Sequence, residues 1–304
     1  MADRLILLDT ASLYFRAFYG VPDTVKAADG RPVNAARGLL DMIAKLVSTY
    51  EPTHAIACWD DDWRPQWRVD LIPSYKTHRV AEVVDDGTDV EEVPDPLTAQ
   101  LPVIRDELAA LGIPVVGHAD HEADDVIASY ASQATIAVDV VTGDRDLFQL
   151  VDDDRAVRVI YTGRGMSKLE VLDGAAVVTK YGVLPVQYAD FAVMRGDASD
   201  GLPGVAGVGE KTAAALLAAH GDLAGIIAAA DSGMLSAGAS AKILAAADYL
   251  AVAPRVVEVV RTLAVPEVDA GLRTPDPAEL ARVEAAWNLG SSLTRAATAI
   301  GARA

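Results

Sequence analysis

Cysteine and long apolar runs are nearly absent from this sequence of 304 residues. The single cysteine, Cys58, excludes an internal disulfide framework and a zinc site built from thiolates, and it favours a reducing, cytoplasmic environment. No apolar run approaches the length of a membrane span, and the first residues do not resemble an export signal. We therefore expect a globular protein with no membrane partner, in which Cys58 is a buried packing residue.

Basic residues are scarce as well, because 26 lysines and arginines stand against 44 aspartates and glutamates, for a formal net charge of -18. Phosphate binding normally requires a basic surface, so this balance argues at first sight against a nucleic-acid partner. A cluster of metal-binding carboxylates inflates the negative total, however, and a basic patch can be local. The net charge therefore does not decide the class of partner.

Two short acidic clusters lie near the middle of the chain. Residues 121–125 (His-Glu-Ala-Asp-Asp) precede an apolar run and predict the first turn of a helix, where carboxylates meet the positive end of the helix dipole. Residues 142–147 (Thr-Gly-Asp-Arg-Asp-Leu) follow the β-branched run 136–141 and predict the end of a strand. Together they bring several acids to one edge of a predicted parallel sheet, where they would repel one another unless cations lay between them.

Two earlier runs also predict buried strands that end in acid. Residues 4–8 lead to Asp9, and residues 54–59 lead to Asp60, which we choose over Asp61 and Asp62 because it directly follows Trp59. Ligand sites of parallel sheets lie outside the carboxyl ends of the strands. Any one of these aspartates could be ordinary turn chemistry, but all of them together favour a site.

Length and pattern predict an α/β protein with a central, mostly parallel sheet flanked by helices. We expect an N-terminal α/β domain over residues 1–170 and a helical subdomain over residues 171–304. The alanine-rich helices after residue 221 are expected to pack within that subdomain.

The acids that the pattern brings together number nine, and no histidine or cysteine group accompanies them. They are Asp9, Asp60, Glu122, Asp124, Asp125, Asp144, Asp146, Asp197 and Asp200. Hard oxygen ligands select Mg²⁺ or Mn²⁺ over zinc. Two such ions, about 3.5 to 4 Å apart, would suit the hydrolysis of a phosphodiester bond.

Two other stretches suit contact with nucleic acid. Residues 63–79 interleave tryptophan and tyrosine with arginine and lysine, a mixture typical of binding to phosphates and bases, although a solvated surface segment is the alternative. The glycine-rich turn at residues 204–212 opens a predicted helix, so the backbone N–H groups of Gly207, Val208 and Gly209 could bind a DNA phosphate. An ordinary connection between two helices remains open there. Residues 81–96 are acidic without period and predict a mobile loop.

Six motifs in this order resemble the bacterial 5'-to-3' exonucleases and flap endonucleases, including the N-terminal nuclease domains of DNA polymerase I. The motifs are Leu7-Leu8-Asp9 with Arg16, Trp59-Asp60, Trp67-Arg68 with Tyr75-Lys76-Thr-His-Arg79, Glu122-Ala-Asp124-Asp125, Thr142-Gly-Asp144-Arg-Asp146-Leu, and Gly196-Asp197-Ala-Ser-Asp200 continued to Thr212. The resemblance covers about residues 4 to 295. It implies a PIN-like 5'-nuclease fold with a helical arch over residues 63–96 and a helix-hairpin-helix element near residues 196–220.

The resemblance also implies a role for each matching residue. Asp9, Asp60, Glu122 and Asp124 would form a first metal region, and Asp144, Asp146, Asp197 and Asp200 a second, with Asp125 between them. Lys76 and Arg79 would be the catalytic cations at the base of the arch. DNA would be bound by Phe15, Arg16, Arg68, Tyr75, Gly207, Gly209, Lys211 and Thr212, and a K⁺ ion is expected at the helix-hairpin-helix.

The function implied is a monomeric, structure-specific 5' nuclease that hydrolyses 5' flaps and 5' ends of branched or nicked DNA in replication and repair, alongside a DNA polymerase and a ligase. Two departures from the family pattern matter: Gly201 stands where an asparagine is usual, and the acidic stretch up to Asp95 is inserted in the arch. Two alternatives stay open, namely a DNA junction-binding protein with weak catalysis and a PIN-like ribonuclease.

Overall fold

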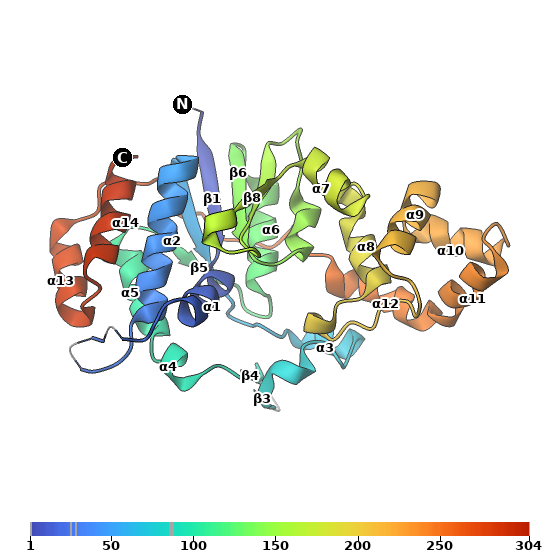
Figure 1. Ribbon diagram of the computed structural model, residues 1–304, viewed down its shortest axis with the longest axis horizontal. Coiled ribbons are helices and arrows are strands. Elements are labelled where there is room, and N and C mark those ends of the chain that lie inside the picture. The colour runs from blue at the N-terminus through green and yellow to red at the C-terminus, as the bar shows by residue number, and fades with distance from the viewer. Residues whose placement is uncertain (1, 25, 28, 85–87, 304) are drawn as a thin grey trace.

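A six-stranded sheet lies at the centre of the computed structural model, which describes residues 2–24, 26–27, 29–84 and 88–303 (Figure 1). The strands follow the order β5-β2-β1-β6-β7-β8, and only β8 runs antiparallel to its neighbour. They are β1 (Arg4–Asp9), β2 (His54–Cys58), β5 (Val115–Val116), β6 (Ala137–Thr142), β7 (Val157–Tyr161) and β8 (Glu170–Leu172). The predicted α/β class with a mostly parallel sheet is confirmed.

The central strand β1 is apolar on both faces because helices cover both sides of the sheet. Leu7 lies opposite Ile56 of β2 and Val140 of β6, so the carboxyl ends of all three strands meet at one edge. The chain proceeds from β1 to β2 and β5 on one side and then returns to β6 on the other. This reversal beside β1 is the position at which open α/β sheets usually bind ligands.

Each face of the sheet has its own hydrophobic core. On one face, Ile6 and Leu8 pack with Leu39 and Leu40 of α2 (Asn34–Tyr50), beside α1 (Thr10–Gly20) and α5 (Leu101–Ala110). On the other, Leu5 and Leu7 pack with Val126 of α6 (Ala123–Gln133).

The last two helices depart from the expectation that the alanine-rich C-terminal helices pack among themselves. α13 (Pro277–Trp287) contacts α5, and α14 (Ser291–Gly301) lies along α2, where Arg295 pairs with Asp41 at 2.6 Å (Figure 1). The physical reason is a buried apolar stripe on α14, including Leu293 and Ile300, that completes the core on the α2 face.

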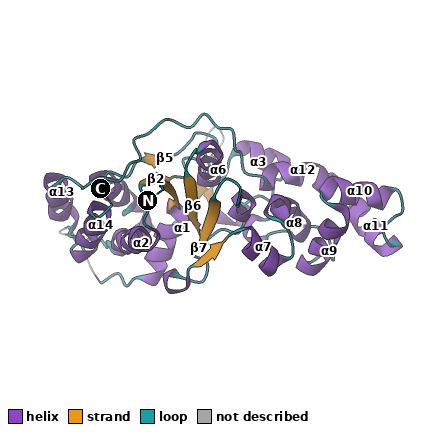
Figure 2. Cartoon of the chain, turned by 90° about the horizontal axis from the view of Figure 1, so that it is seen from above, coloured by secondary structure: helices purple, strands orange, loops and turns teal. Residues whose placement is uncertain are grey.

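The remaining C-terminal helices extend away from the sheet (Figure 2). They are α7 (Gly174–Tyr181), α8 (Tyr188–Arg195), α9 (Glu210–His220), α10 (Leu223–Asp231), α11 (Ala237–Ala245) and α12 (Ala247–Val257). Within the described residues no single helix is long and apolar enough to span a bilayer, although α9 and α10, bent by 84°, pass that test as a pair.

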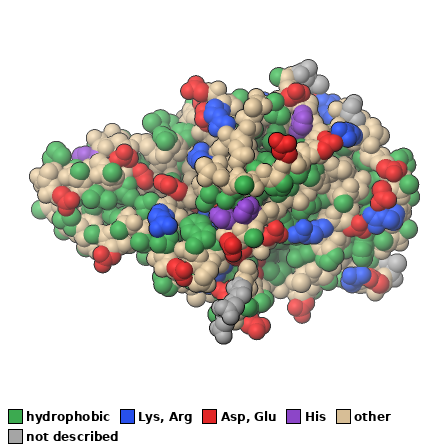
Figure 3. Space-filling model, turned by 180° about the vertical axis from the view of Figure 1, so that it is seen from behind, with side chains coloured by type: hydrophobic (Ala, Val, Ile, Leu, Met, Phe, Trp, Pro, Cys, Tyr) green, Lys and Arg blue, Asp and Glu red, His purple; other side chains and the backbone are tan. Residues whose placement is uncertain are grey.

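The segment between β2 and α5 runs below the carboxyl edge of the sheet in the view of Figure 1 and crosses from one side of the molecule to the other. It contains α3 (Gln66–Leu71), a 3₁₀ turn η1 (Thr77–Arg79), the antiparallel strands β3 (Val80–Glu82) and β4 (Val90–Glu91), and α4 (Asp95–Thr98). The expectation that residues 81–96 lack regular structure is therefore wrong, since two very short strands pair there; residues 85–87, with two of the acids, lie outside the described part. On the face seen in Figure 3, Lys and Arg side chains are scattered among acidic ones.

Candidate active site

A cavity of about 240 Å³ opens at the carboxyl edge of the sheet. Five of the predicted acids line it, one or more from each of β1, β2, α6 and β6 or the residues that adjoin them: Asp9, Asp60, Glu122, Asp124 and Asp144. Lys76, Arg79 and Glu91 of the crossing segment close its other side. Residues that are far apart in the sequence thus meet where the strand ends predicted them.

Local hydrogen bonds fix the orientation of these acids. Asp9 caps α1 by accepting from the Ser12 N–H at 3.1 Å, and its second oxygen accepts from the Thr142 hydroxyl at 2.6 Å. Asp60 accepts from the N–H of Ala123 at 2.7 Å, which ties the end of β2 to the first turn of α6. These contacts orient the carboxylates without neutralising their charge.

Burial and like charge perturb this group strongly. Burial raises the pKa of Asp9 to about 6, with Asp144 adding to the effect and the hydrogen bonds from Thr142 and Ser12 opposing it. Burial likewise raises the pKa of Asp60 to about 7, with Glu122 and Asp9 adding to the effect. The pKa of Asp124 is raised well above its ordinary value by burial and then by Asp144 and Asp9. Mutual effects of this kind are expected for acids that share one site.

Of the four other predicted acids, two lie next to this cavity, on its side toward α12. Asp146 and Asp200 line a narrow adjoining cavity together with Glu122 and Asp124. Burial raises the pKa of Asp200 to about 6 and raises that of Asp146 well above its ordinary value. Asp197 differs, because it pairs with Arg195 at 3.2 Å and Arg145 at 3.4 Å.

Glu122 and Asp125 are held by cations within the protein. Arg68 donates to both oxygens of Asp125, at 2.9 and 2.8 Å, and to Glu122 at 3.0 Å. The second oxygen of Glu122 pairs with Lys76, and Asp125 also accepts from the Val260 N–H at 2.8 Å. Burial alone would raise the pKa of Glu122, but Lys76 and Arg68 outweigh it and lower that pKa.

The described residues contain no group of three or more His, Cys, Asp or Glu side chains already gathered into an ion site. The physical reason is visible in these contacts, since Glu122 and Asp125 turn toward arginine and lysine while the other acids line the cavity walls.

Two predicted DNA-binding residues are buried. Arg68 is 2% exposed, and Tyr75, 4% exposed, donates its hydroxyl to Glu122 at 2.7 Å. In this conformation neither can reach a DNA strand, because both side chains are buried and donate hydrogen bonds to the acids. The sequence pattern of alternating basic and aromatic residues cannot distinguish an outward face from an inward one.

Lys76 and Arg79 do lie at the cavity. The Lys76 ammonium is buried and pairs with Glu122; burial would lower its pKa, but Glu122, Tyr75 and Asp200 together raise it well above the ordinary value. Arg79 pairs with Glu91, a residue that sequence reasoning missed. Only the pairing of β3 with β4 brings that glutamate to the site, and two strands so short leave little signal in a sequence.

Gly201, which replaces the asparagine usual in the family, contacts the base of the crossing segment. It has φ +70°, and a Cβ there would lie 2.1 Å from the Ser74 carbonyl oxygen. The N–H of Lys76 donates to the Asp200 carbonyl at 3.0 Å, and the Ser74 hydroxyl donates to the Gly201 carbonyl at 2.8 Å. A glycine is therefore required for this close approach, which fixes the backbone of Lys76 beside Asp200.

Phe15 and Arg16 line a second cavity of about 700 Å³ that adjoins the first through Ser12 and Phe15 itself. Tyr19, at 73% exposed, forms part of its wall. The Nε of Arg16 is buried without a hydrogen-bond partner among the described residues, so a polar acceptor in this cavity could satisfy it.

The predicted turn at Gly207 and Gly209 forms as expected. Gly207 has φ +72°, and Gly209 is the N-cap of α9, whose first turn exposes Lys211 and Thr212. The Gly207 carbonyl accepts a hydrogen bond from the ammonium of Lys242 on α11 at 2.8 Å.

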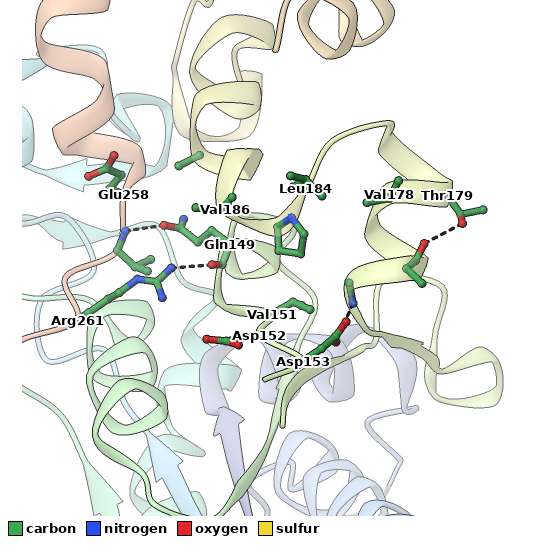
Figure 4. Close-up of a pocket in the computed structure, with 15 residues that line it drawn as sticks. Gln149, Val151, Asp152, Asp153, Val178, Thr179, Leu184, Val186, Glu258 and Arg261 are labelled. Carbon is green, nitrogen blue, oxygen red and sulfur yellow. Dashed lines mark hydrogen bonds between the residues drawn. The ribbon is translucent and has the colours of Figure 1, made fainter. Parts of the chain in front are cut away.

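A larger cavity, of about 1090 Å³, lies on the far side of the η2 turn (Asp146–Leu150), between that turn, α7 and residues 258–261 (Figure 4). Its walls include the exposed side chains of Leu184 and Val186, and Arg261 donates to the Gln149 carbonyl at 2.6 Å. None of the nine predicted acids lines it. Size alone thus does not mark the chemical site in this fold.

The chain is similar to several known proteins. Two family models match: 5'-3' exonuclease, N-terminal resolvase-like domain, over residues 4–182, and 5'-3' exonuclease, C-terminal SAM fold, over residues 183–279. A 5'-3' exonuclease of Streptomyces coelicolor is 57% identical over 97% of this chain and 99% of its own length. A 5'-3' exonuclease of Mycobacterium tuberculosis is 48% identical over 97% of each chain. The bacteriophage T5 D15 flap endonuclease, solved with DNA and metal ions, superposes with a TM-score of 0.63 at 18% identity, over 99% of this chain and 98% of that one.

Proposed function

The chain belongs to the 5'-3' exonuclease family, and from this premise we propose that it is a divalent-metal-dependent nuclease that cuts DNA at 5' ends and 5' flaps. Cleavage would occur near the junction of single strand and duplex. The observation that supports this most strongly is the cavity, in which buried carboxylates from four different elements raise one another's pKa.

The acids present fit a hard divalent cation. Among the described residues, Asp9, Asp60, Asp124 and Asp144 have no ion-pair partner, and carboxylate oxygens without nearby sulfur or imidazole favour Mg²⁺ or Mn²⁺. Asp9, Asp60, Glu122 and Asp124 would hold the first metal region, and Asp144, Asp146, Asp197 and Asp200 would hold the second. Asp125 would support them through Arg68. When bound, two such ions would supply positive charge to the attacking and leaving oxygens of an in-line displacement.

The cations of the crossing segment would act on the substrate directly. Lys76 and Arg79 would steer the scissile phosphate into the cavity and stabilise the charge that develops on it. Phe15 would stack on the terminal base, and Arg16 would donate to that nucleotide in the adjoining cavity.

The helical part would bind the duplex. Gly207 and Gly209 would present backbone N–H groups to a phosphate, with Lys211 and Thr212 beside them. We assign duplex binding to the region after residue 171, and the chemistry to residues 1–170 together with Asp197 and Asp200. A K⁺ ion bound at this turn would share the Gly207 carbonyl with the Lys242 ammonium, which donates to it at 2.8 Å.

The chemistry of the products suggests the setting. Removing a 5' flap leaves a nick or gap, which a polymerase and a ligase would complete, and we propose that the chain acts as a monomer in the cytoplasm. Of the alternatives, a DNA junction-binding protein with weak catalysis would not need so many uncompensated acids. A ribonuclease would not need the duplex grip.

The test is cleavage of a labelled 5'-flap DNA, a matched RNA flap and a plain duplex in Mg²⁺, Mn²⁺ or EDTA. We expect metal-dependent cutting of the DNA flap near the junction, abolished by EDTA. Binding without cleavage in either metal would favour the junction-binding alternative, and faster cleavage of the RNA flap would favour the ribonuclease.

A further inference from the structure

Glu91 is the sixth carboxylate that lines the cavity, and the mechanism above gives it no task. It accepts from Arg79 Nε at 3.0 Å, and a second nitrogen of the same guanidinium donates to the same carboxylate. The Glu91 side chain is 15% exposed and that of Arg79 is 36% exposed, so the pair lies at the mouth of the cavity.

The hairpin of β3 and β4 holds Glu91 in this position. Glu91 lies opposite Val80 in the strand pair, and the Glu92 N–H donates to the Arg79 carbonyl at 2.7 Å. A few residues earlier, Asp89 forms a buried ion pair with Arg64, and its carbonyl accepts from the Trp63 indole at 2.7 Å. The hairpin is therefore anchored to the rest of the crossing segment at both positions. These contacts hold the Glu91 carboxylate beside Arg79.

A single oxygen of Glu91 accepts from both nitrogens of Arg79, and an anionic phosphate oxygen could take the same place. A substrate phosphate that binds the Nε and Nη2 edge of Arg79 must therefore replace Glu91, which occupies both of these nitrogens. The 36% exposure of the Arg79 side chain gives a phosphate access to the guanidinium from solvent.

We propose that Glu91 is a built-in competitor for the substrate phosphate at Arg79, and that it weakens the binding of DNA generally. This inference rests on the proposed function, in which Arg79 binds a phosphate. The competing carboxylate keeps Arg79 oriented toward the cavity in the free protein and limits its affinity for DNA that is not also held by the helical part.

The decisive experiment compares Glu91→Gln with Glu92→Gln, which removes the same charge from the exposed neighbouring residue. Binding of a fluorescent 5'-flap DNA is measured in EDTA, and steady-state cleavage in Mg²⁺. We expect Glu91→Gln to lower the Kd and KM roughly fivefold with little change in kcat, because about 1 kcal/mol of competing ion pair is removed. Glu92→Gln should change either constant less than twofold.

A double-mutant cycle identifies the partner. In an Arg79→Ala background, Glu91→Gln should no longer tighten binding, because its effect acts through that arginine. A Glu91→Gln protein that binds DNA no more tightly than Glu92→Gln, or that loses kcat, would overturn the inference and make Glu91 a positioning residue. Glu91→Asp, which keeps the charge on a shorter side chain, provides a second reading if Glu91→Gln is unstable. If the unmodified protein cuts no flap at all, the proposed function fails instead, while the binding comparison still tests the competition.

Discussion

The two walls of the cavity treat charge in opposite ways. On the sheet side, Asp9, Asp60, Asp124 and Asp144 are buried or half-buried carboxylates for which the described residues provide no ion-pair partner. On the side of the crossing segment, which we call the arch side, every lysine and arginine of residues 63–96 is already paired. Arg64 pairs with Asp89, Arg68 with Glu122 and Asp125, Lys76 with Glu122, and Arg79 with Glu91.

This difference teaches how an acidic protein can work on an anionic substrate. The sheet side lacks positive charge, which divalent ions can supply, whereas the arch side holds positive charge that is released when acids exchange partners. The net charge of -18 therefore need not oppose DNA binding. Metal ions would neutralise the acids of one wall, and the cations of the other wall would exchange a protein carboxylate for a phosphate.

The largest effect is expected on the sheet side. Asp124→Asn removes a carboxylate whose charge no protein cation compensates, so single-turnover cleavage of flap DNA should fall on the order of 1000-fold at saturating Mg²⁺. Asp61→Asn is the matched control, because Asp61 lies outside the cavity near Arg105, at 3.5 Å. A loss smaller than tenfold for Asp124→Asn would break the comparison between the two walls.

The arch side should respond in kcat rather than in binding. Lys76→Met should lower kcat about 100-fold while the Kd for flap DNA changes little, because the ammonium would act mainly on charge in the transition state. Unfolding in urea should accompany these measurements, since Glu122 loses one of its partners. Equal losses in kcat and in binding would contradict the assigned role.

A buried carboxylate outside the cavity sharpens the contrast. Both oxygens of Glu107 on α5 lack a hydrogen-bond partner among the described residues, and burial raises its pKa well above 4.5. The folded state then retains a proton that the unfolded state releases, so this residue's contribution to stability falls as pH rises above about 4.5. Glu107→Gln should therefore gain about 1 to 3 kcal/mol of unfolding free energy relative to the unmodified protein between pH 4.5 and 8.

The neighbouring Asp106 provides the control with the opposite sign. A hydrogen bond from Arg282 lowers its pKa, so its contribution is present above the unfolded pKa and lost as pH falls through the folded one. Denaturant titrations of Glu107→Gln and Asp106→Asn at several pH values measure both. A stability difference for Glu107→Gln that does not vary with pH would contradict the raised pKa of Glu107. A difference that Mg²⁺ abolishes would mean that Glu107 binds metal, as is proposed only for the acids on the sheet side.

The smallest effect is expected far from both walls. Lys211→Ala at the start of α9 should weaken binding of duplex DNA a few-fold and reduce the slope of log Kd against log salt by about 0.9, because one phosphate contact is lost. Cleavage by bound enzyme should be unchanged. An unaltered salt slope in fluorescence titrations would show that Lys211 does not contact a phosphate of the duplex.

Much of the fold and of the acid set could be predicted from the sequence. The strands ending at Asp9 and Thr142 and the helix opening at Glu122 follow from hydrophobic pattern and end signals, because a buried parallel strand must be apolar and its carboxyl end must turn. The six ordered motifs resembled a family to which the chain does belong.

Only the tertiary structure decided which charges face one another. Arg68 and Tyr75 turn inward, Glu91 reaches Arg79 through a hairpin of very short strands, and α14 returns to α2. Local pattern records whether a residue prefers water or the core, but the partner of a charged side chain depends on contacts made across dozens of residues. The sequence therefore determined where the acids would gather, and the folded chain determined which of them are held by its own cations and which have no such partner among the described residues.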